Sequence, residues 1–230
     1  MDDAQRLRLI GERAADEVPD GATIGLGTGS TADAMLTALG ARIRQGLRVT
    51  GVATSARTIA RAREVGIPLT SLDEVASLTV CIDGADEIDP DLNLVKGRGG
   101  ALLYEKLVAE RSERLVIIAS AEKLVDRLGT RLPLPVEVVP FGCSHTARLV
   151  ARLGLEPALR VTDDGQPFVT DGGHHILDCE THGIDDPAAL AASLKAFTGV
   201  VEHGLFVGMA SLALTIDPEG VIAEHVADSR

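Results

Sequence analysis

A chain of 230 residues with 45% hydrophobic residues and a formal net charge of −12 has the composition of a globular protein. The negative charge repels nucleic acid, and one Tyr, four Phe and no Trp leave few aromatic surfaces on which bases could stack. The longest apolar runs have strand length, and the charged start MDDAQRLRLI resembles neither a signal peptide nor a membrane span. We therefore expect a cytoplasmic protein that binds neither nucleic acid nor a membrane.

Helical and strand patterns alternate through the first 128 residues. A helix is expected at residues 5–17, followed by strands near residues 23, 47, 78 and 114 with helices between them. Such alternation predicts an α/β fold with a doubly wound, mostly parallel, Rossmann-like sheet.

A proline-rich segment at residues 131–135 interrupts this alternation. The order beyond it predicts a second, smaller α+β domain of the split βαβ, ferredoxin-like type. Its expected elements are strand 136–139, helix 144–153, strands near 159 and 168, strand 175–179 and helix 188–197. A hairpin at residues 214–225 is expected to return to the first domain. The predicted domains are residues 1–130 plus 205–230, and residues 131–204.

A glycine-rich turn follows the first strand, in the sequence Gly25-Leu-Gly-Thr-Gly-Ser-Thr31. Gly27 and Gly29 free the backbone to wrap an anion, and Ser30 or Thr31 can cap the helix that follows. The third glycine of a dinucleotide fingerprint is absent, no acidic residue ends the next strand, and no Gly-Lys-Ser/Thr Walker sequence occurs. The turn therefore predicts a site for a monophosphate.

A second polar cluster follows the apolar run at residues 78–82. The expected strand delivers Asp83, Asp86 and Glu87 to the carboxyl edge of the sheet, where open α/β sheets bind ligands. Acidic Asp-Gly segments are also typical of solvated turns, so the motif alone leaves both interpretations open.

Lysine and glycine residues continue this cluster. Gly97, Gly99 and Gly100 allow backbone amides to approach an anion beside Lys96, and Glu105 follows in the first two turns of a helix. The chain has four lysines against eighteen arginines, which indicates that Lys96 and Lys123 are kept for their compact ammonium groups. Lys123 follows the strand near residue 114 and reaches the same sheet edge as Asp83; a solvated loop lysine is the alternative.

Cysteine and histidine residues point to no further chemistry. Cys81, Cys143 and Cys179 form no CxxC pair and are expected to be reduced thiols, mostly buried. His174 and His175 would point to opposite faces of a strand, so we expect no metal there.

Six segments together resemble ribose-5-phosphate isomerase, type A, in order and over nearly the whole chain. They are GLGTGST (25–31), DGADEID (83–89), KGRGGALLYEK (96–106), the lysine of EKLVDRLG (123), LPVEVVPF (134–141) and GVVEHGLF (199–206). The family's usual Asp-x-Ser-Lys is altered before Lys123, where Ser120 and Glu122 stand. Residues 170–174 likewise replace the usual Asp-Asn-Gly.

The resemblance implies an aldose–ketose isomerase without cofactor or metal, which interconverts ribose 5-phosphate and ribulose 5-phosphate through an enediolate. That reaction belongs to the non-oxidative branch of the pentose phosphate pathway, and the family suggests a homodimer or homotetramer. By motif, Glu105 would be the proton-transferring base, with Asp83, Asp86 and Lys96 as further catalytic groups. The implied substrate contacts are Thr28, Gly29, Ser30, Thr31, Asp83, Gly84, Ala85, Asp86, Lys96, Gly97, Arg98, Gly99 and Lys123.

Two other classes of function stay open at this point. One is a sugar-phosphate sensor of a repressor, although only about twenty residues precede the first strand and no basic recognition helix is among them. The other is a different reaction on a similar scaffold. Acyl transfer with Glu105 as nucleophile would leave a glutamyl thioester, and deamination of an amino-sugar phosphate would release ammonia.

Overall fold

The computed structural model describes residues 1–226 and contains two compact units. Unit 1 is formed by Met1–Ala85, Tyr104–Lys123 and the chain from Met209, and unit 2 by Asp86–Leu103 and Leu124–Gly208. The domain boundaries expected near residues 131 and 205 stay a prediction, and they differ from these units in placing residues 86–103, 124–130 and 205–208 with the first domain.

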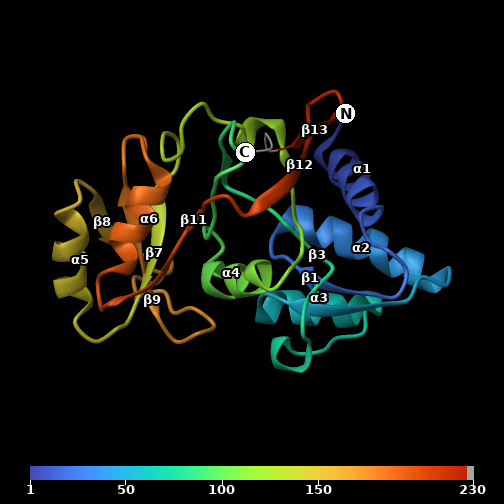
Figure 1. Ribbon diagram of the computed structural model, residues 1–230, viewed down its shortest axis with the longest axis horizontal. Helices are drawn as coiled ribbons and strands as arrows, with labels where there is room; N and C mark the ends of the chain where they lie inside the picture. The colour runs from blue at the N-terminus through green and yellow to red at the C-terminus, as the bar shows by residue number, and fades with distance from the viewer. Residues whose placement is uncertain (227–230) are drawn as a thin grey trace. The chain divides into compact units, whose positions relative to one another are not determined.

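Unit 1 is built on a six-stranded sheet with the order β13-β12-β6-β3-β1-β2. Figure 1 labels β1, β3, β12 and β13 of this sheet. Neighbouring strands are parallel except for the antiparallel pair β12–β13, which forms the expected C-terminal hairpin. The Rossmann-like α/β sheet predicted from the alternating pattern is therefore present. Its strands are β1 (Ala22–Leu26), β2 (Val49–Ala53), β3 (Val80–Asp83), β6 (Leu115–Ser120), β12 (Ala210–Ile216) and β13 (Ile222–Val226).

Helices cover both faces of this sheet, because alternate residues of a strand point to opposite sides. Ile24 and Leu26 of β1 enter the core formed with α1, α2 and α3, in which Met35 is fully buried. Gly25 faces the other side, where a Cβ atom would meet Val108 of α4. The helices are α1 (Asp3–Ala15), α2 (Ser30–Arg44), α3 (Ala56–Val65) and α4 (Leu102–Glu110), with the 3-10 turns η1 (Leu72–Glu74) and η2 (Ala121–Lys123).

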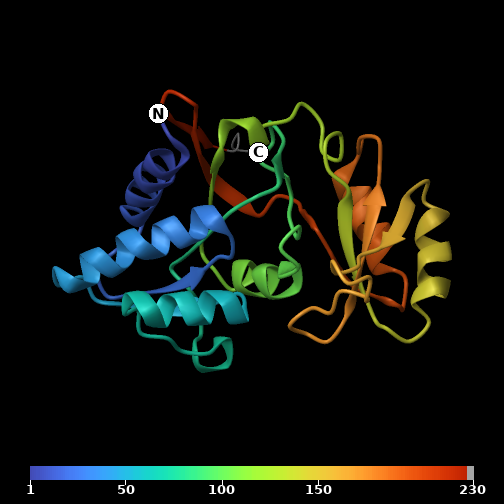
Figure 2. The ribbon, with the colours of Figure 1, turned by 180° about the vertical axis from the view of Figure 1, so that it is seen from behind.

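Unit 2 contains a four-stranded antiparallel sheet with the order β10-β7-β9-β8 and two helices that Figure 2 shows from behind. Strand β9 lies between β7 and β8, which is the expected split βαβ arrangement. Val136, Leu177 and Leu194 belong to the core between this sheet and its helices. The elements are β7 (Leu134–Val138), α5 (Cys143–Ala151), β8 (Glu156–Leu159), β9 (His175–Glu180), α6 (Pro187–Lys195) and β10 (Val200–His203).

Three short strands complete unit 2. They form a separate sheet of β4 (Glu87–Ile88), β5 (Leu94–Val95) and β11 (Leu205–Phe206), in the order β11-β5-β4. Among residues 1–226 no helix is long and apolar enough to cross a membrane.

Two expectations about unit 2 are wrong. No strand forms near Phe168: the chain turns at residues 162–166 and makes a single bridge between Val161 and Pro167. The cause is local, because Asp-Asp-Gly-Gln-Pro favours a tight turn and Pro167 lacks an amide donor for a ladder. The strand expected at 136–139 begins at Leu134 instead, so the presumed interruption contributes Pro135 to β7, opposite Asp178.

Candidate active site

The turn between β1 and α2 lies against the end of β3 in unit 1. Asp83 Oδ1 accepts hydrogen bonds from the amides of Thr28 (3.0 Å) and Gly84 (2.7 Å). Gly27 passes so close that a Cβ atom would lie 2.1 Å from Asp83 Oδ1, and its amide donates to Ile82 O at 2.9 Å. The structure therefore brings together the predicted phosphate turn and the first predicted carboxylate, with Ala85 following two residues after Asp83.

The start of α2 is open. Gly29 is the N-cap, with φ +121°, and no side chain caps the helix; Ser30 and Thr31 are its first two residues. The expectation that Ser30 or Thr31 caps the helix is therefore wrong, because glycine takes the cap position and its positive φ turns the chain. The first-turn amides, with the partial positive charge of the helix N-terminus, suit an anion.

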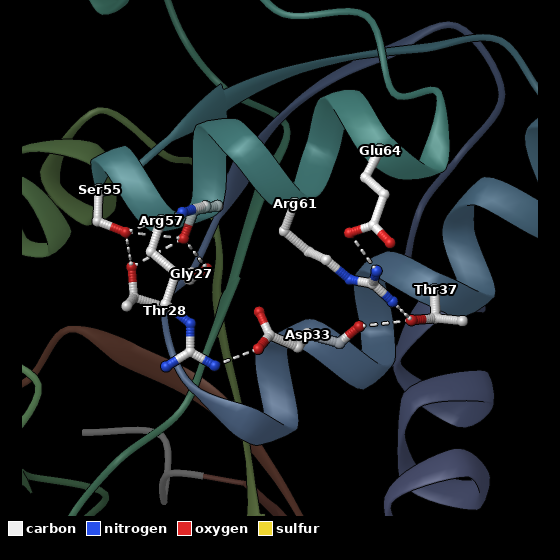
Figure 3. Close-up of polar contacts among 9 residues, drawn as sticks. Gly27, Thr28, Asp33, Thr37, Ser55, Arg57, Arg61 and Glu64 are labelled. Atoms are coloured by element: carbon white, nitrogen blue, oxygen red, sulfur yellow. Dashed lines mark hydrogen bonds and ion pairs between the residues drawn. The ribbon is translucent and has the colours of Figure 1, made fainter.

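Three hydroxyl residues that sequence analysis missed hold the turn from behind. Thr28 Oγ1 lies 2.9 Å from Thr54 Oγ1 and 2.9 Å from Thr58 Oγ1. It also donates to Ser55 Oγ at 2.8 Å (Figure 3). Thr54 donates to Leu26 O at 2.9 Å and Thr58 to Gly27 O at 3.0 Å, and both side chains are fully buried. Their signal in the sequence is the hydroxyl pair Thr54-Ser55, where the second strand ends without an acidic residue.

One ion pair and one hydrogen bond join α2 and α3 beside this hydroxyl cluster, as Figure 3 shows. Arg57, in the first turn of α3, donates to Asp33 in the first turn of α2. Arg61 donates to Thr37 Oγ1 at 2.7 Å and pairs with Glu64 at 2.6 Å. The two helices that begin at the hydroxyl cluster are thus joined in their first turns by Arg57 and Asp33, and one turn further on by Arg61 and Thr37.

Lys123 and Glu105 also belong to unit 1. Strand β6 lies parallel to β3, so Lys123, at the end of η2 just after β6, reaches the same sheet edge as Asp83. In the altered loop before it, Ser120 Oγ donates to Glu122 at 3.1 Å. Glu105 lies in the first turn of α4 and is 5% exposed.

The remaining predicted residues lie in unit 2. Lys96 is 3% exposed, with its amide donating to Gly204 O at 2.8 Å and its ammonium 5.4 Å from the ring centre of Phe206. Asp86 Oδ2 accepts from the amide of Arg98 at 2.9 Å. Gly97 and Gly100 both have positive φ, +105° and +82°, which shape the turn from Lys96 to α4.

Glu87 does not share the predicted role of its neighbours. Its fully buried carboxylate accepts hydrogen bonds from the amides of Gly129 (2.5 Å), Arg131 (2.9 Å) and Leu132 (3.0 Å). The expectation that it joins Asp83 and Asp86 at a ligand is wrong, since strand β4 turns it into unit 2, where it anchors a loop.

Two cavities lie within single units. One of about 260 Å³ in unit 2 is lined by predicted residues Asp86 and Arg98 together with Pro135, Arg160 and Asp178. The other, about 650 Å³ in unit 1, contains none of the predicted site residues.

Cys179, His174 and His175 interact with neighbouring groups of unit 2. Burial raises the pKa of the Cys179 thiol to about 12, with Asp178 and Glu180 adding to the effect. His174 Nδ1 lies 2.9 Å from Glu137 Oε1, whereas His175 Nδ1 lies 3.2 Å from Phe168 O. Within residues 1–226 no group of three or more His, Cys, Asp or Glu side chains is placed to hold a metal ion.

Comparisons with known proteins agree on one family. The family model described as ribose 5-phosphate isomerase A (phosphoriboisomerase A) matches residues 50–220. Ribose-5-phosphate isomerase A of Roseiflexus castenholzii is 54% identical over 100% of this chain and 99% of its own length. The solved structure of ribose 5-phosphate isomerase A from Methanocaldococcus jannaschii has a TM-score of 0.92 at 34% identity, covering 98% of this chain and 100% of that one.

A second solved D-ribose-5-phosphate isomerase, in complex with phospho-erythronic acid, has a TM-score of 0.94 at 34% identity, covering 98% of this chain and 100% of that one. The family match covers more than half of the chain and includes Asp83, Asp86 and the glycine turn of unit 2. On these grounds the chain belongs to the ribose 5-phosphate isomerase A family, and it is an isomerase.

Proposed function

We propose that the protein interconverts D-ribose 5-phosphate and D-ribulose 5-phosphate through an enediolate, with Glu105 as the base that moves the proton. The observation that carries this proposal is the placement of Glu105. It is a carboxylate of 5% exposure in the first turn of α4, immediately after the glycine turn that contains Lys96. A base shielded from water in this way is suited to taking a proton from carbon.

The phosphate of the substrate is assigned to the turn of unit 1. Thr28, Gly29, Ser30 and Thr31 supply an uncapped helix N-terminus and hydroxyl groups, which recognise a phosphate without a lysine of their own. Because the chain carries a net charge of −12, such a local site is needed to overcome long-range repulsion of the anion. The solved relative that binds phospho-erythronic acid, a phosphorylated sugar acid, supports this class of ligand.

The reaction moves a proton and two electrons between neighbouring carbons. Glu105 takes the C2 proton of the open-chain aldose, and the electrons of the broken C–H bond form the C1=C2 double bond while O1 becomes an oxyanion. Return of the proton to C1 and transfer of the hydroxyl proton from O2 to O1 give the ketose. Lys96 and Lys123 would stabilise the oxyanion, which is often the largest contribution to catalysis.

Asp83 and Asp86 are assigned to proton transfer between O1 and O2 and to opening of the furanose ring. Backbone amides donate to both carboxylates: Thr28 and Gly84 to Asp83 Oδ1, and Arg98 to Asp86 Oδ2. These bonds orient both side chains. Gly84, Ala85 and Gly97 would complete the backbone around the sugar.

Glu105→Gln tests the role of the base. We expect turnover of ribose 5-phosphate to fall about 100- to 10,000-fold, while the affinity for a phosphorylated sugar acid changes little. The matched control is Glu110→Gln, an exposed carboxylate on the same helix, which should retain full turnover. Unchanged turnover in Glu105→Gln would remove Glu105 from this role.

Isotope exchange tests the enediolate. The chelator-treated wild-type protein, incubated with ribose 5-phosphate in deuterated water, should form ribulose 5-phosphate with deuterium at C1 or C2, seen by NMR. Ketose formation without any label would favour a hydride shift instead. A glutamyl thioester or released ammonia would point to the acyl-transfer or deamination alternatives.

We also propose a cytoplasmic location and a homodimeric or homotetrameric state, following the family resemblance. Size-exclusion chromatography with light scattering measures the assembly directly, and a monomer at micromolar concentration would contradict it.

A further inference from the structure

The guanidinium group of Arg160 is fixed within unit 2. Its Nε and Nη2 donate to the two oxygens of Asp178, at 2.8 Å and 2.5 Å. The side chains are only 14% and 27% exposed, and the guanidinium lies 5.7 Å from the ring centre of Phe168. Because such a two-pronged pair defines the plane of the arginine, its remaining donors point in a set direction.

Those donors point at the glycine turn. Nη1 of Arg160 donates to Gly97 O and to Arg98 O, both at 3.0 Å, across 63 and 62 residues of sequence. Two consecutive peptide carbonyls of the turn between Lys96 and α4 are therefore bound by one cation.

The orientation of these carbonyls sets the orientation of the amides. In a planar trans peptide the C=O and the following N–H point in opposite directions. The peptide joining Gly97 to Arg98 shows this, since its carbonyl meets Arg160 while its N–H meets Asp86 Oδ2 at 2.9 Å. The next peptide has its carbonyl on Arg160 as well, so the N–H of Gly99 points away from the arginine.

The Gly99 amide has no protein acceptor. It donates to no backbone or side-chain atom of the described residues, 1–226, and Gly99 is exposed. A carbonyl bonded to a cation polarises its peptide group, which makes the N–H at the other end a stronger donor. The turn thus presents the Gly99 N–H in a fixed direction and as a stronger hydrogen-bond donor.

Phe168 completes the support for the turn. A Cβ atom at Gly100 would lie 2.5 Å from Phe168 Cζ, so the ring packs directly on the turn as well as on Arg160. The Lys96–Gly100 turn is therefore supported by residues distant in sequence, which come from the segment after β8 and from strand β9.

We propose that Arg160, oriented by Asp178, is a positioning residue that holds the Lys96–Gly100 turn so that the Gly99 amide donates a hydrogen bond to a sugar oxygen of the substrate. The inference rests on the proposed function, and it adds residues that the sequence motifs did not include. The bond would be made to an oxygen whose negative charge grows during the reaction, so it should affect kcat more than KM.

Steady-state kinetics of Arg160→Ala with ribose 5-phosphate test this. We expect kcat to fall about 10- to 100-fold with KM changed less than about threefold, as for other losses of alignment. Arg160→Lys, which keeps a donor for the carbonyls, should recover part of the loss. The matched control is Arg127→Ala, since Arg127 in the same unit also binds a carboxylate, Asp185, and a backbone carbonyl, but is remote from the turn in its contacts. A kcat within twofold of wild type in Arg160→Ala would overturn the proposal.

A second measurement covers the case in which Arg160→Ala fails to fold. With ¹⁵N-glycine labelling, the Gly99 amide proton of the wild type should shift downfield on addition of phospho-erythronic acid, and this shift should shrink in Arg160→Lys. An unmoved Gly99 signal at saturating ligand would overturn the assignment. Absence of ketose formation by the wild type would instead overturn the proposed function, so the two failures are distinguishable.

Discussion

The turn at Gly27–Ser30 in unit 1 and the turn at Lys96–Gly100 in unit 2 both expose backbone amides, but different interactions hold them. The Thr28 side chain of the first contacts the buried neutral hydroxyls of Thr54, Ser55 and Thr58, while its amide donates to Asp83. The second rests on an ion pair, Arg160 with Asp178, whose donors reach the carbonyls of the turn.

The difference has an electrostatic consequence. Neutral hydrogen bonds supply geometry without adding charge, so in the first turn the partial charge of the helix N-terminus acts on the anion unopposed by the supporting cluster. In the second turn the ion pair both fixes the turn and polarises the peptide groups that Arg160 binds. Such polarisation suits an amide, that of Gly99, which should respond to changing charge on the substrate. The three predictions below test this contrast, from the largest expected effect to the smallest.

Replacing one glycine by alanine in each turn should give the largest difference in stability between the two turns. Gly27→Ala should destabilise the protein by about 3 kcal/mol and abolish activity, because the new Cβ would lie 2.1 Å from Asp83 Oδ1 and 2.5 Å from its Cα. Gly99→Ala should change the free energy of unfolding by less than about 0.5 kcal/mol, since a Cβ there meets no atom within 4 Å. Urea denaturation measures both. Equal losses of stability would contradict the difference in packing between Gly27 and Gly99.

Removing one buried hydroxyl probes the neutral support. Thr58→Val should cost about 1–3 kcal/mol, because Gly27 O loses its donor at 3.0 Å while the site stays buried. The control is Ser144→Ala, which removes an exposed hydroxyl on α5, with an expected change below about 0.5 kcal/mol. The loss in Thr58→Val should be the same at low and high salt, since no full charge is removed. A strong salt dependence would show that the cluster is not acting as a neutral support.

Removing the carboxylate of an ion pair should have the smallest effect on stability, and we compare a shielded pair with an exposed one. Asp178→Asn should cost about 1 kcal/mol and lower kcat, whereas Asp20→Asn should leave activity unchanged. Hydrogen bonds from the Arg48 side chain and backbone hold the pKa of Asp20 at about 2, below its ordinary value of 3.8. Its folded-state pKa is lowered, so any stabilisation is present above about pH 4 and is lost as the pH falls toward 2.

The exposed pair Asp20–Arg48 is also the reference for the effect of salt on ion-pair strength. Asp20 and Arg48 lie in water, with side chains 52% and 79% exposed, so 1 M NaCl should screen their interaction. Arg160 and Asp178 are better shielded and should be screened less. Equal salt sensitivity of unfolding in the two variants would remove the distinction between them.

Local patterns predicted much of the fold. The alternation of helical and strand patterns gave the parallel sheet, and the glycines at 27 and 29 marked the turn that meets Asp83. These features depend on residues close in sequence, where periodicity and turn chemistry act directly. The strand expected near Phe168 failed for a local reason too, because turn residues and Pro167 override its apolar character.

The supports of the site could not be predicted in this way. Arg160 meets the turn across 62 residues, and Thr28 meets Thr58 across 30. No motif links such partners, since their contact depends on strand order and on the fact that each unit is formed by segments separated in sequence. Glu87 shows the same limit, because its partners at residues 129–132 are distant and its neighbours Asp83 and Asp86 suggested another role.

The position of β12 in the sheet has a consequence for biosynthesis. This strand lies between β6 and β13, yet residues 210–216 leave the ribosome after β6 and after the whole of unit 2. Until then β6 offers an unpaired parallel edge to any other nascent chain, a recognised hazard for aggregation. Yield of soluble protein should therefore depend on how quickly translation crosses unit 2, and a chaperone that shields that edge would act on a half-made enzyme.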